Sequence, residues 1–176
     1  MNSDFLDLVI KRQSCRSFQK KQIPREVIDS IIEAGRLSPS ARNSQPWSFT
    51  VVLSEEKVEQ VGECTRANSR NAFTTECSAY VIITEEDSSE AFGGLKHRYF
   101  AEMDIGMSVM NMCLMAEHSG IASCILGSFD ADGVKQIADI SKDKEVKLII
   151  ALGYASDGYE VREKKRKSYE DIVRVI

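Results

Sequence analysis

The segment from Tyr99 to His118 limits how this chain can fold more than any other feature does. It predicts a long helix that ends before Gly120. Five of the six methionines lie in it, together with Ile105, Val109, Cys113 and Leu114. From Ile105 onward the helix is apolar nearly all round, so it must be buried on most sides. In a chain of 176 residues, such a helix is a candidate for sharing with a second subunit. The methionines are interpreted as packing residues rather than as a metal or cofactor site.

The rest of the chain mixes helical and strand patterns. Helices are expected over residues 3–12, from Pro24 to Gly35, from Ser54, over 132–140, and from Ser168 as a cap; strands are expected over 47–53, 79–84, 122–126 and 146–154. Residues 64–76 are polar and give no clear pattern. Strands and helices do not alternate strictly, so the sequence predicts a single α+β domain over 1–176, with helices around a small sheet.

Composition excludes several classes of protein. A net charge of −4 gives no general attraction to nucleic acid, and no apolar run approaches the roughly 20 residues of a membrane helix. Asp4 and Asp7 lie where a signal peptide would be basic. Five cysteines without a CxxC spacing fit a reducing compartment, and His97 and His118 do not suggest a zinc site. The expectation is a cytoplasmic protein without a metal, a membrane partner or a nucleic-acid partner.

Residues 38–47 read SPSARNSQPW. Pro39 and Pro46 remove backbone donors and fix φ, so this stretch is predicted to be a loop. It is dense in side-chain donors and acceptors, and it ends on Trp47, the only tryptophan, which is expected to anchor it in the core. A loop of this composition suggests a binding role.

Two basic segments lie far apart in the sequence. Arg12 and Arg16 flank Ser14 near the start, and Lys164 to Lys167 form a basic run near the end. Arginine can bind phosphate oxygens in a bidentate manner, so the two segments could converge on one phosphate. A solvated turn and a solvated tail are the alternatives.

Gly127 follows the predicted strand 122–126. A glycine there lets the backbone approach a flat ligand and offer its amides, although a plain turn explains it as well. Neither GxGxxG nor GxxxxGK[ST] occurs in the chain, which argues against the Rossmann and P-loop modes of nucleotide binding.

The order of these motifs carries a resemblance. IKRQSCRSF near the start is followed by SPSARNSQPW, by the long helix running into HSGIASCILGSF, by IIALGY, and by a basic segment before EDIV. From end to end this resembles the nitroreductase family of FMN-dependent oxidoreductases, in a compact form. The resemblance implies a sandwich fold with a small mixed or antiparallel sheet, assembled as an intertwined homodimer. It also implies an FMN in each interface cleft, and a tail over about 156–176 packed on the partner.

The resemblance further implies a set of FMN contacts. Arg12, Ser14 and Arg16 would meet the phosphate and ribityl chain, Gln13 would lie near the ring, and Lys164 and Arg166 would reach the same phosphate from the tail. Leu126 and Gly127 would lie against the ring with their backbone near N5, and Asn71 would contact the ring or the ribityl chain. Pro39, Ser40, Arg42 and Asn43 would come from the other subunit.

The chemistry implied by the resemblance belongs to FMN rather than to a catalytic side chain. NADH or NADPH would deliver hydride to N5 and leave, and a nitroaromatic, quinone or flavin would then take its place in a ping-pong reaction. Three alternatives remain: a dehalogenase-like or flavin-consuming relative, a flavin-binding redox sensor with low turnover, and a dimer without a cofactor. Residues 85–100 are the only candidate for a substrate lid.

Overall fold

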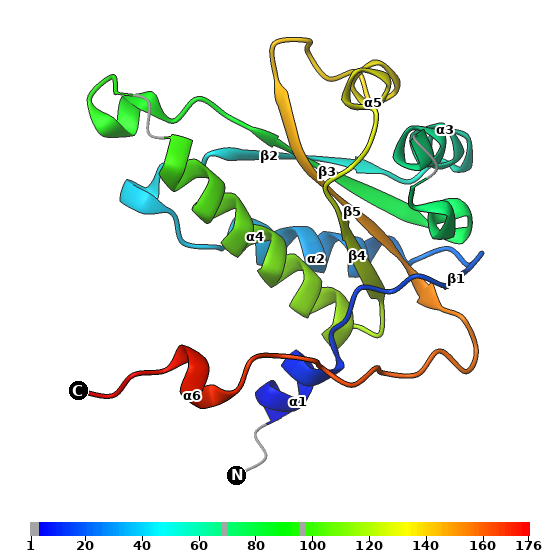
Figure 1. Ribbon diagram of the computed structural model, residues 1–176. Helices are drawn as coiled ribbons and strands as arrows, with labels where there is room; N and C mark the ends of the chain where they lie inside the picture. The colour runs from blue at the N-terminus through cyan, green and yellow to red at the C-terminus, as the bar shows by residue number, and fades with distance from the viewer. Residues whose placement is uncertain (1–3, 68–69, 96–97) are drawn as a thin grey trace.

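The computed structural model describes residues 4–67, 70–95 and 98–176 and has an α+β architecture (Figure 1). The helices are α1 (Asp4–Lys11), α2 (Arg25–Arg36), α3 (Glu55–Arg66), α4 (Arg98–His118), α5 (Ala131–Ile137) and α6 (Tyr169–Ile172). Short 3₁₀ turns are η1 (Ala41–Asn43), η3 (Ala72–Glu76) and η4 (Ser89–Phe92). The strands are β1 (Phe18–Gln19), β2 (Trp47–Val52), β3 (Ala79–Glu85), β4 (Ala122–Leu126) and β5 (Glu145–Ala155).

One antiparallel sheet organises the domain. Its strands follow the order β1-β5-β3-β2, and β4 pairs with β5. Every pair of named strands is antiparallel, and one isolated parallel bridge joins Ser14 to Ser123. Helices α2 and α4 pack together on one side of the sheet, while α3 and α5 pack together on the other (Figure 1). The layered α+β fold predicted from the sequence is therefore confirmed, with the sheet antiparallel.

Side chains that alternate between the two faces of the central strands divide the hydrophobic core into two clusters. Val81 and Ile83 of β3 belong to the cluster that contains residues of α2 and α4, whereas Tyr80 and Ile82 belong to the cluster with α3 and α5. Successive side chains of a strand point to opposite faces, so a strand buried on both faces is apolar without interruption. All of Ala79 to Thr84 is buried, as this explanation requires.

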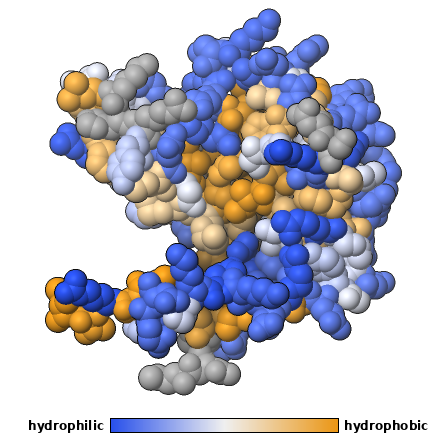
Figure 2. All heavy atoms as spheres, viewed as in Figure 1, coloured by the Kyte–Doolittle hydropathy of each residue, from blue (hydrophilic) through white to orange (hydrophobic). Residues whose placement is uncertain are grey.

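Helix α4 is buried on most sides but not on all of them. Ile105, Val109 and neighbouring residues fill the core, whereas Met103, Met107 and Met110 are 43%, 42% and 39% exposed. Spacings of four and three place these methionines on one face of the helix. Figure 2 shows hydrophobic residues across the hollowed side of the molecule on which α4 lies. The expected burial on most sides is therefore confirmed, and one face of α4 stays uncovered within one chain.

Most predicted element boundaries are confirmed to within a few residues. Trp47 is buried in the core, as expected, and the Ser168 side chain accepts a hydrogen bond from Asp171 N at the start of α6. The two-residue strand β1 has no signal in the sequence, and the loop 38–47 contains the 3₁₀ turn η1. Ser3, the expected start of the first helix, lies outside the described residues. Among the described helices, none is long and apolar enough to cross a membrane.

The cap of α5 gives a first testable prediction. The Asp130 carboxylate accepts a hydrogen bond from Gly133 N at 3.2 Å, while its own backbone is extended. Asp130→Ala is expected to lower the free energy of unfolding by about 1 kcal/mol, because it removes this cap. Urea denaturation followed by circular dichroism measures the change. Asp132→Ala is the control, since the Asp132 side chain is 93% exposed in its ion pair with Lys135; an equal loss in both variants would contradict the prediction.

Candidate cofactor site

The segment that follows α1 is fixed against the edge of the sheet. Arg12 N donates to Leu8 O, which continues the helical pattern by one residue. Cys15 N donates to Ser123 O of β4 at 2.9 Å, next to the Ser14–Ser123 bridge. Cys15 is only 1% exposed, so its side chain holds the segment in the core. The polar side chains on either side of Cys15 are thereby brought to the surface beside β4.

The chain returns to this segment after β5. Tyr159 Oη accepts a hydrogen bond from Arg16 N at 3.0 Å. Arg162 donates from Nη2 to Ser14 O at 2.8 Å, and Lys164 Nζ donates to Arg12 O at 2.8 Å. Residues about 150 positions apart in the sequence therefore form one continuous surface.

This surface encloses a strongly basic cavity of about 500 Å³. Its lining consists of Arg12, Gln13, Ser14, Arg16, Arg162, Glu163, Lys164, Lys165 and Arg166. Six of these side chains are cationic and only Glu163 is anionic. The predicted convergence of the two basic segments is confirmed as geometry. A phosphate dianion, which accepts charge-assisted hydrogen bonds from arginine and lysine, fits this set of donors.

Electrostatics in the cavity favour an anion. The pKa of Lys164 is lowered, first by partial burial and then by the positive charges of Arg12, Arg166 and Arg162. The cations therefore repel one another in the protein alone. A bound anion would relieve this repulsion.

Gln13 makes contacts within the chain at this site, and its expected place near the flavin ring stays a prediction. Its Nε2 donates to Glu160 O at 3.0 Å, and its Oε1 accepts from the backbone N and from Nε of Arg162. Both ends of the side-chain amide therefore hold the tail.

Arg162 lies outside the predicted site, because it precedes the basic run that contains Lys164 and Arg166. A glutamate separates Arg162 from that run, so the run of basic residues in the sequence does not include it.

At the end of β4, the backbone rather than a side chain is the candidate for contact with a ligand. Leu126 is 2% exposed, with its side chain in the core, and Gly127 follows it. Asn71 has a left-handed backbone with φ of 54°, and its Nδ2 donates to Thr65 O at 3.0 Å and to Ser128 O at 2.9 Å. Asn71 thus ties the end of α3 to the loop after β4. A contact between Asn71 and a flavin stays a prediction.

The loop 38–47 is held at the other end of α4. Asp104 Oδ2 accepts from Ala41 N at 3.0 Å, and Asn111 Nδ2 donates to Ser38 Oγ at 2.8 Å. Arg42 donates to Ala91 O at 3.3 Å, and its guanidinium lies 5.4 Å from the centre of the Phe92 ring. These contacts attach the loop to α4 and to η4.

The same loop has a strained backbone. Arg42, Asn43 and Gln45 have φ values of 53°, 54° and 45°, in the left-handed region that is costly for residues other than glycine. Strain of this kind persists where the surroundings fix the conformation, and it concentrates at binding sites. The loop therefore presents its polar groups in one conformation.

Within one chain, this loop does not reach the basic cavity. Pro39, Ser40, Arg42 and Asn43 are absent from the described lining of that cavity. Asp104 binds the loop, whereas the charge of Arg12 acts on Glu117 near the end of α4. Thirteen helical residues at 1.5 Å each separate those two positions by roughly 20 Å along the helix. Two sets of predicted contacts thus lie at opposite ends of α4.

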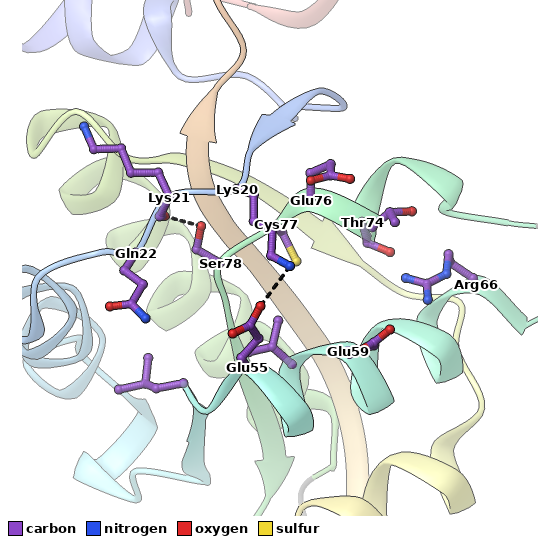
Figure 3. Close-up of a pocket in the computed structure, with 13 residues that line it drawn as sticks. Lys20, Lys21, Gln22, Glu55, Glu59, Arg66, Thr74, Glu76, Cys77 and Ser78 are labelled. Atoms are coloured by element: carbon purple, nitrogen blue, oxygen red, sulfur yellow. Dashed lines mark hydrogen bonds and ion pairs between the residues drawn. The ribbon is translucent and has the colours of Figure 1, made fainter.

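A second cavity, of about 440 Å³, lies between β1, α3 and η3 (Figure 3). Its lining includes Lys20, Lys21 and Arg66, but also Glu55, Glu59 and Glu76, and Lys20 forms an ion pair with Glu55 at 2.8 Å. Cys77 also lines it, and burial raises the pKa of that thiol to about 11. Balanced charge and a protonated thiol give this cavity no preference for an anion and no nucleophile.

Comparison with known proteins agrees with the fold. A protein of Methanothermobacter thermautotrophicus whose name includes NAD(P)H nitroreductase is 26% identical, over 91% of this chain and 82% of that protein. The iodotyrosine dehalogenase 1 homolog of Caenorhabditis elegans is 23% identical over 97% of this chain, which spans 61% of that longer protein. A solved Staphylococcus epidermidis structure, whose designation includes NAD(P)H:FMN oxidoreductase, has a TM-score of 0.83 at 25% identity; the match covers 99% of this chain and 97% of that one.

The sequence profile of one family covers most of the chain. It matches residues 9–68 and 54–154, which include the segment after α1, the loop 38–47 and the end of β4. The fold and the order of motifs agree with this match. The chain belongs to the Nitroreductase family.

Proposed function

We propose that this protein is an FMN-dependent oxidoreductase that takes hydride from NADH or NADPH. The observation that carries the proposal is the cavity in which six cationic side chains converge with only one carboxylate. Arg12, Ser14, Arg16, Lys164 and Arg166 would hold the phosphate and the ribityl chain. The isoalloxazine ring would lie against the backbone at Leu126 and Gly127. Membership of the family and the names of its relatives support this assignment.

FMN, when bound, supplies the hydride acceptor and donor. The chain's own task is to orient the ring and to place positive charge and backbone donors around it. Hydride transfer needs stacking geometry rather than a titrating side chain, so the proposal assigns no catalytic acid or base. The thiols close to this region, Cys15 and Cys124, are buried with raised pKa values, which suits packing rather than reaction.

The proposal includes a homodimer in which each subunit completes the other's site. The exposed methionines of α4 and the exposed apolar tail, with Tyr169 and Ile172 at 67% and 66%, leave apolar area for a second copy to cover. The blue-to-orange change along the lower edge of Figure 2 follows this tail. Residues 39–43 of one subunit would then meet the basic cavity of the other. The 20 Å separation within one chain supports this arrangement.

The test is the visible spectrum of the purified protein, before and after anaerobic addition of NADH or NADPH. A flavin spectrum that bleaches within seconds to minutes is expected. Protein that neither carries nor takes up FMN would contradict the assignment of the cofactor. Protein that holds FMN but stays oxidised with both nicotinamides would contradict the reductase and favour a redox sensor.

A dehalogenase-like reaction is the second candidate, because the dehalogenase homolog aligns with almost the whole chain. Phe92 of η4 stacks on Phe100 of α4, with ring centres 5.7 Å apart, and Arg42 lies over Phe92. This aromatic group would cover an aromatic substrate. Halide release from a halogenated phenol, measured against reduction of a nitroaromatic or quinone by the same protein, separates the two reactions.

A further inference from the structure

One edge of the Arg162 guanidinium group is hydrogen-bonded to the segment that follows α1. Nε donates to Gln13 Oε1 at 3.1 Å and Nη2 donates to Ser14 O at 2.8 Å. The backbone N of Arg162 also donates to Gln13 Oε1, at 3.2 Å. Three hydrogen bonds therefore fix the side chain and its backbone in a single position before any ligand binds.

The other edge of the Arg162 guanidinium group takes no part in these hydrogen bonds. Arginine has five N–H donors in a planar fork, and the two side-chain bonds use only two of them. Within the described ranges, no hydrogen bond is made by Nη1, and the exposed side chain lines the basic cavity. A planar group fixed along one edge is pre-organised to bind an anion along the other.

The charge of Arg162 acts at the same place as those of the predicted site. It contributes, with Arg12 and Arg166, to the lowered pKa of Lys164. The loop is also held from a second side, since Tyr159 Oη accepts from Arg16 N. Arg162 thus belongs to the cavity by geometry and by charge.

We propose that Arg162 is a phosphate-binding residue of the cofactor site, which holds Gln13 and Ser14 with one edge of its guanidinium and binds the phosphate with the other. The inference rests on the assignment of FMN above and extends it beyond the residues that the family resemblance implies. Arg162 would hold the loop and the tail together around the same anion, so that the phosphate bridges two segments distant in sequence.

The experiment compares FMN with riboflavin, which has the same ring but no phosphate. Dissociation constants are measured from flavin fluorescence for the wild-type protein, R162Q and R162K. R162Q is expected to weaken FMN binding by about tenfold or more, the loss expected for a charge-assisted hydrogen bond, while the affinity for riboflavin changes less than about twofold. R162K keeps the charge but not the fork, so it is expected to restore only part of the affinity for FMN.

Lys167→Gln is the matched control. It removes the same charge from the same tail, but Lys167 does not line the cavity in the described structure. Equal losses of FMN affinity in R162Q and K167Q would show a general charge effect and overturn the proposal. Equal losses of FMN and riboflavin in R162Q would show that Arg162 only positions the loop, which also overturns it. If the wild-type protein bound riboflavin and FMN with equal affinity, the proposed phosphate site would be wrong. If it bound neither, the assignment of FMN itself would be wrong.

Discussion

Arg12→Ala is expected to weaken FMN binding by about 10- to 150-fold, while the protein stays folded and keeps the assembly of the wild-type protein. Arg12 lines the basic cavity, and a charge-assisted hydrogen bond contributes about 1.5–3 kcal/mol, which gives that range. The fold should tolerate the change, because the bond that Lys164 donates to this residue goes to its backbone oxygen. Isothermal titration with FMN measures the affinity, and sedimentation velocity measures the assembly.

Lys11→Ala is the control for Arg12→Ala. Lys11 is the adjacent cation, but it lines a different groove, between α1 and the end of α4. Its loss is expected to change FMN affinity by less than about threefold, through long-range charge alone. Full flavin affinity in Arg12→Ala would contradict the phosphate assignment. An equal loss in both variants would show that net charge, rather than the cavity, determines binding.

A double variant, Met107→Glu with Met110→Glu, is expected to dissociate the proposed dimer. Both methionines are exposed on one face of α4, the face left uncovered within one chain. Burying two carboxylates from each subunit without partners should cost at least about 4 kcal/mol, which raises the dimer dissociation constant about 1000-fold or more. Sedimentation velocity at micromolar concentration should then show a folded monomer. FMN affinity should fall as well, since residues 39–43 of the partner would be missing from the cavity.

Leu53→Glu is the matched control for the methionine variant. Leu53 is 39% exposed, as Met110 is, but it lines the second cavity beyond β2 rather than the α4 face. The control is expected to keep the assembly of the wild-type protein. A methionine variant with an unchanged dissociation constant would contradict the proposed interface, and FMN binding by a stable monomer would contradict the shared site.

Sequence periodicity predicted the elements well where burial is simple. The β3 segment is apolar without interruption because both faces of the strand are covered, and the predicted span 79–84 differs from the observed strand by a single residue. The 47–53 alternation and the β4 segment were equally clear. Strand β1 was missed because two residues carry no period, and its pairing with β5 depends on a partner more than 130 positions away.

The residues of the candidate site show the same difference between what local sequence predicts and what depends on distant contacts. The arginines around Ser14, the loop 38–47 and Gly127 could be identified as candidates from local sequence, although a solvated turn explains the arginines, and a plain turn explains Gly127, equally well. Arg162 could not, because its importance comes from bonds to Gln13 and Ser14 across 148 or more positions. The hydrogen bond from the Gln13 amide to the tail is equally invisible in local sequence, and the place of Gln13 near the flavin ring stays a prediction. Such contacts depend on how β5 directs the chain back past α1.

The sequence alone determined the helices, the apolar strands, the two basic segments and the resemblance to a family, because hydrophobic period, proline and charge act over a few residues. The tertiary structure decided which cations share a cavity, which face of α4 stays uncovered and where the strained loop lies. Those outcomes depend on the packing of elements distant in sequence, which is set by the whole sheet and its two helical layers. Six cations are brought to one place, and residues 39–43 are held roughly 20 Å away from it along α4.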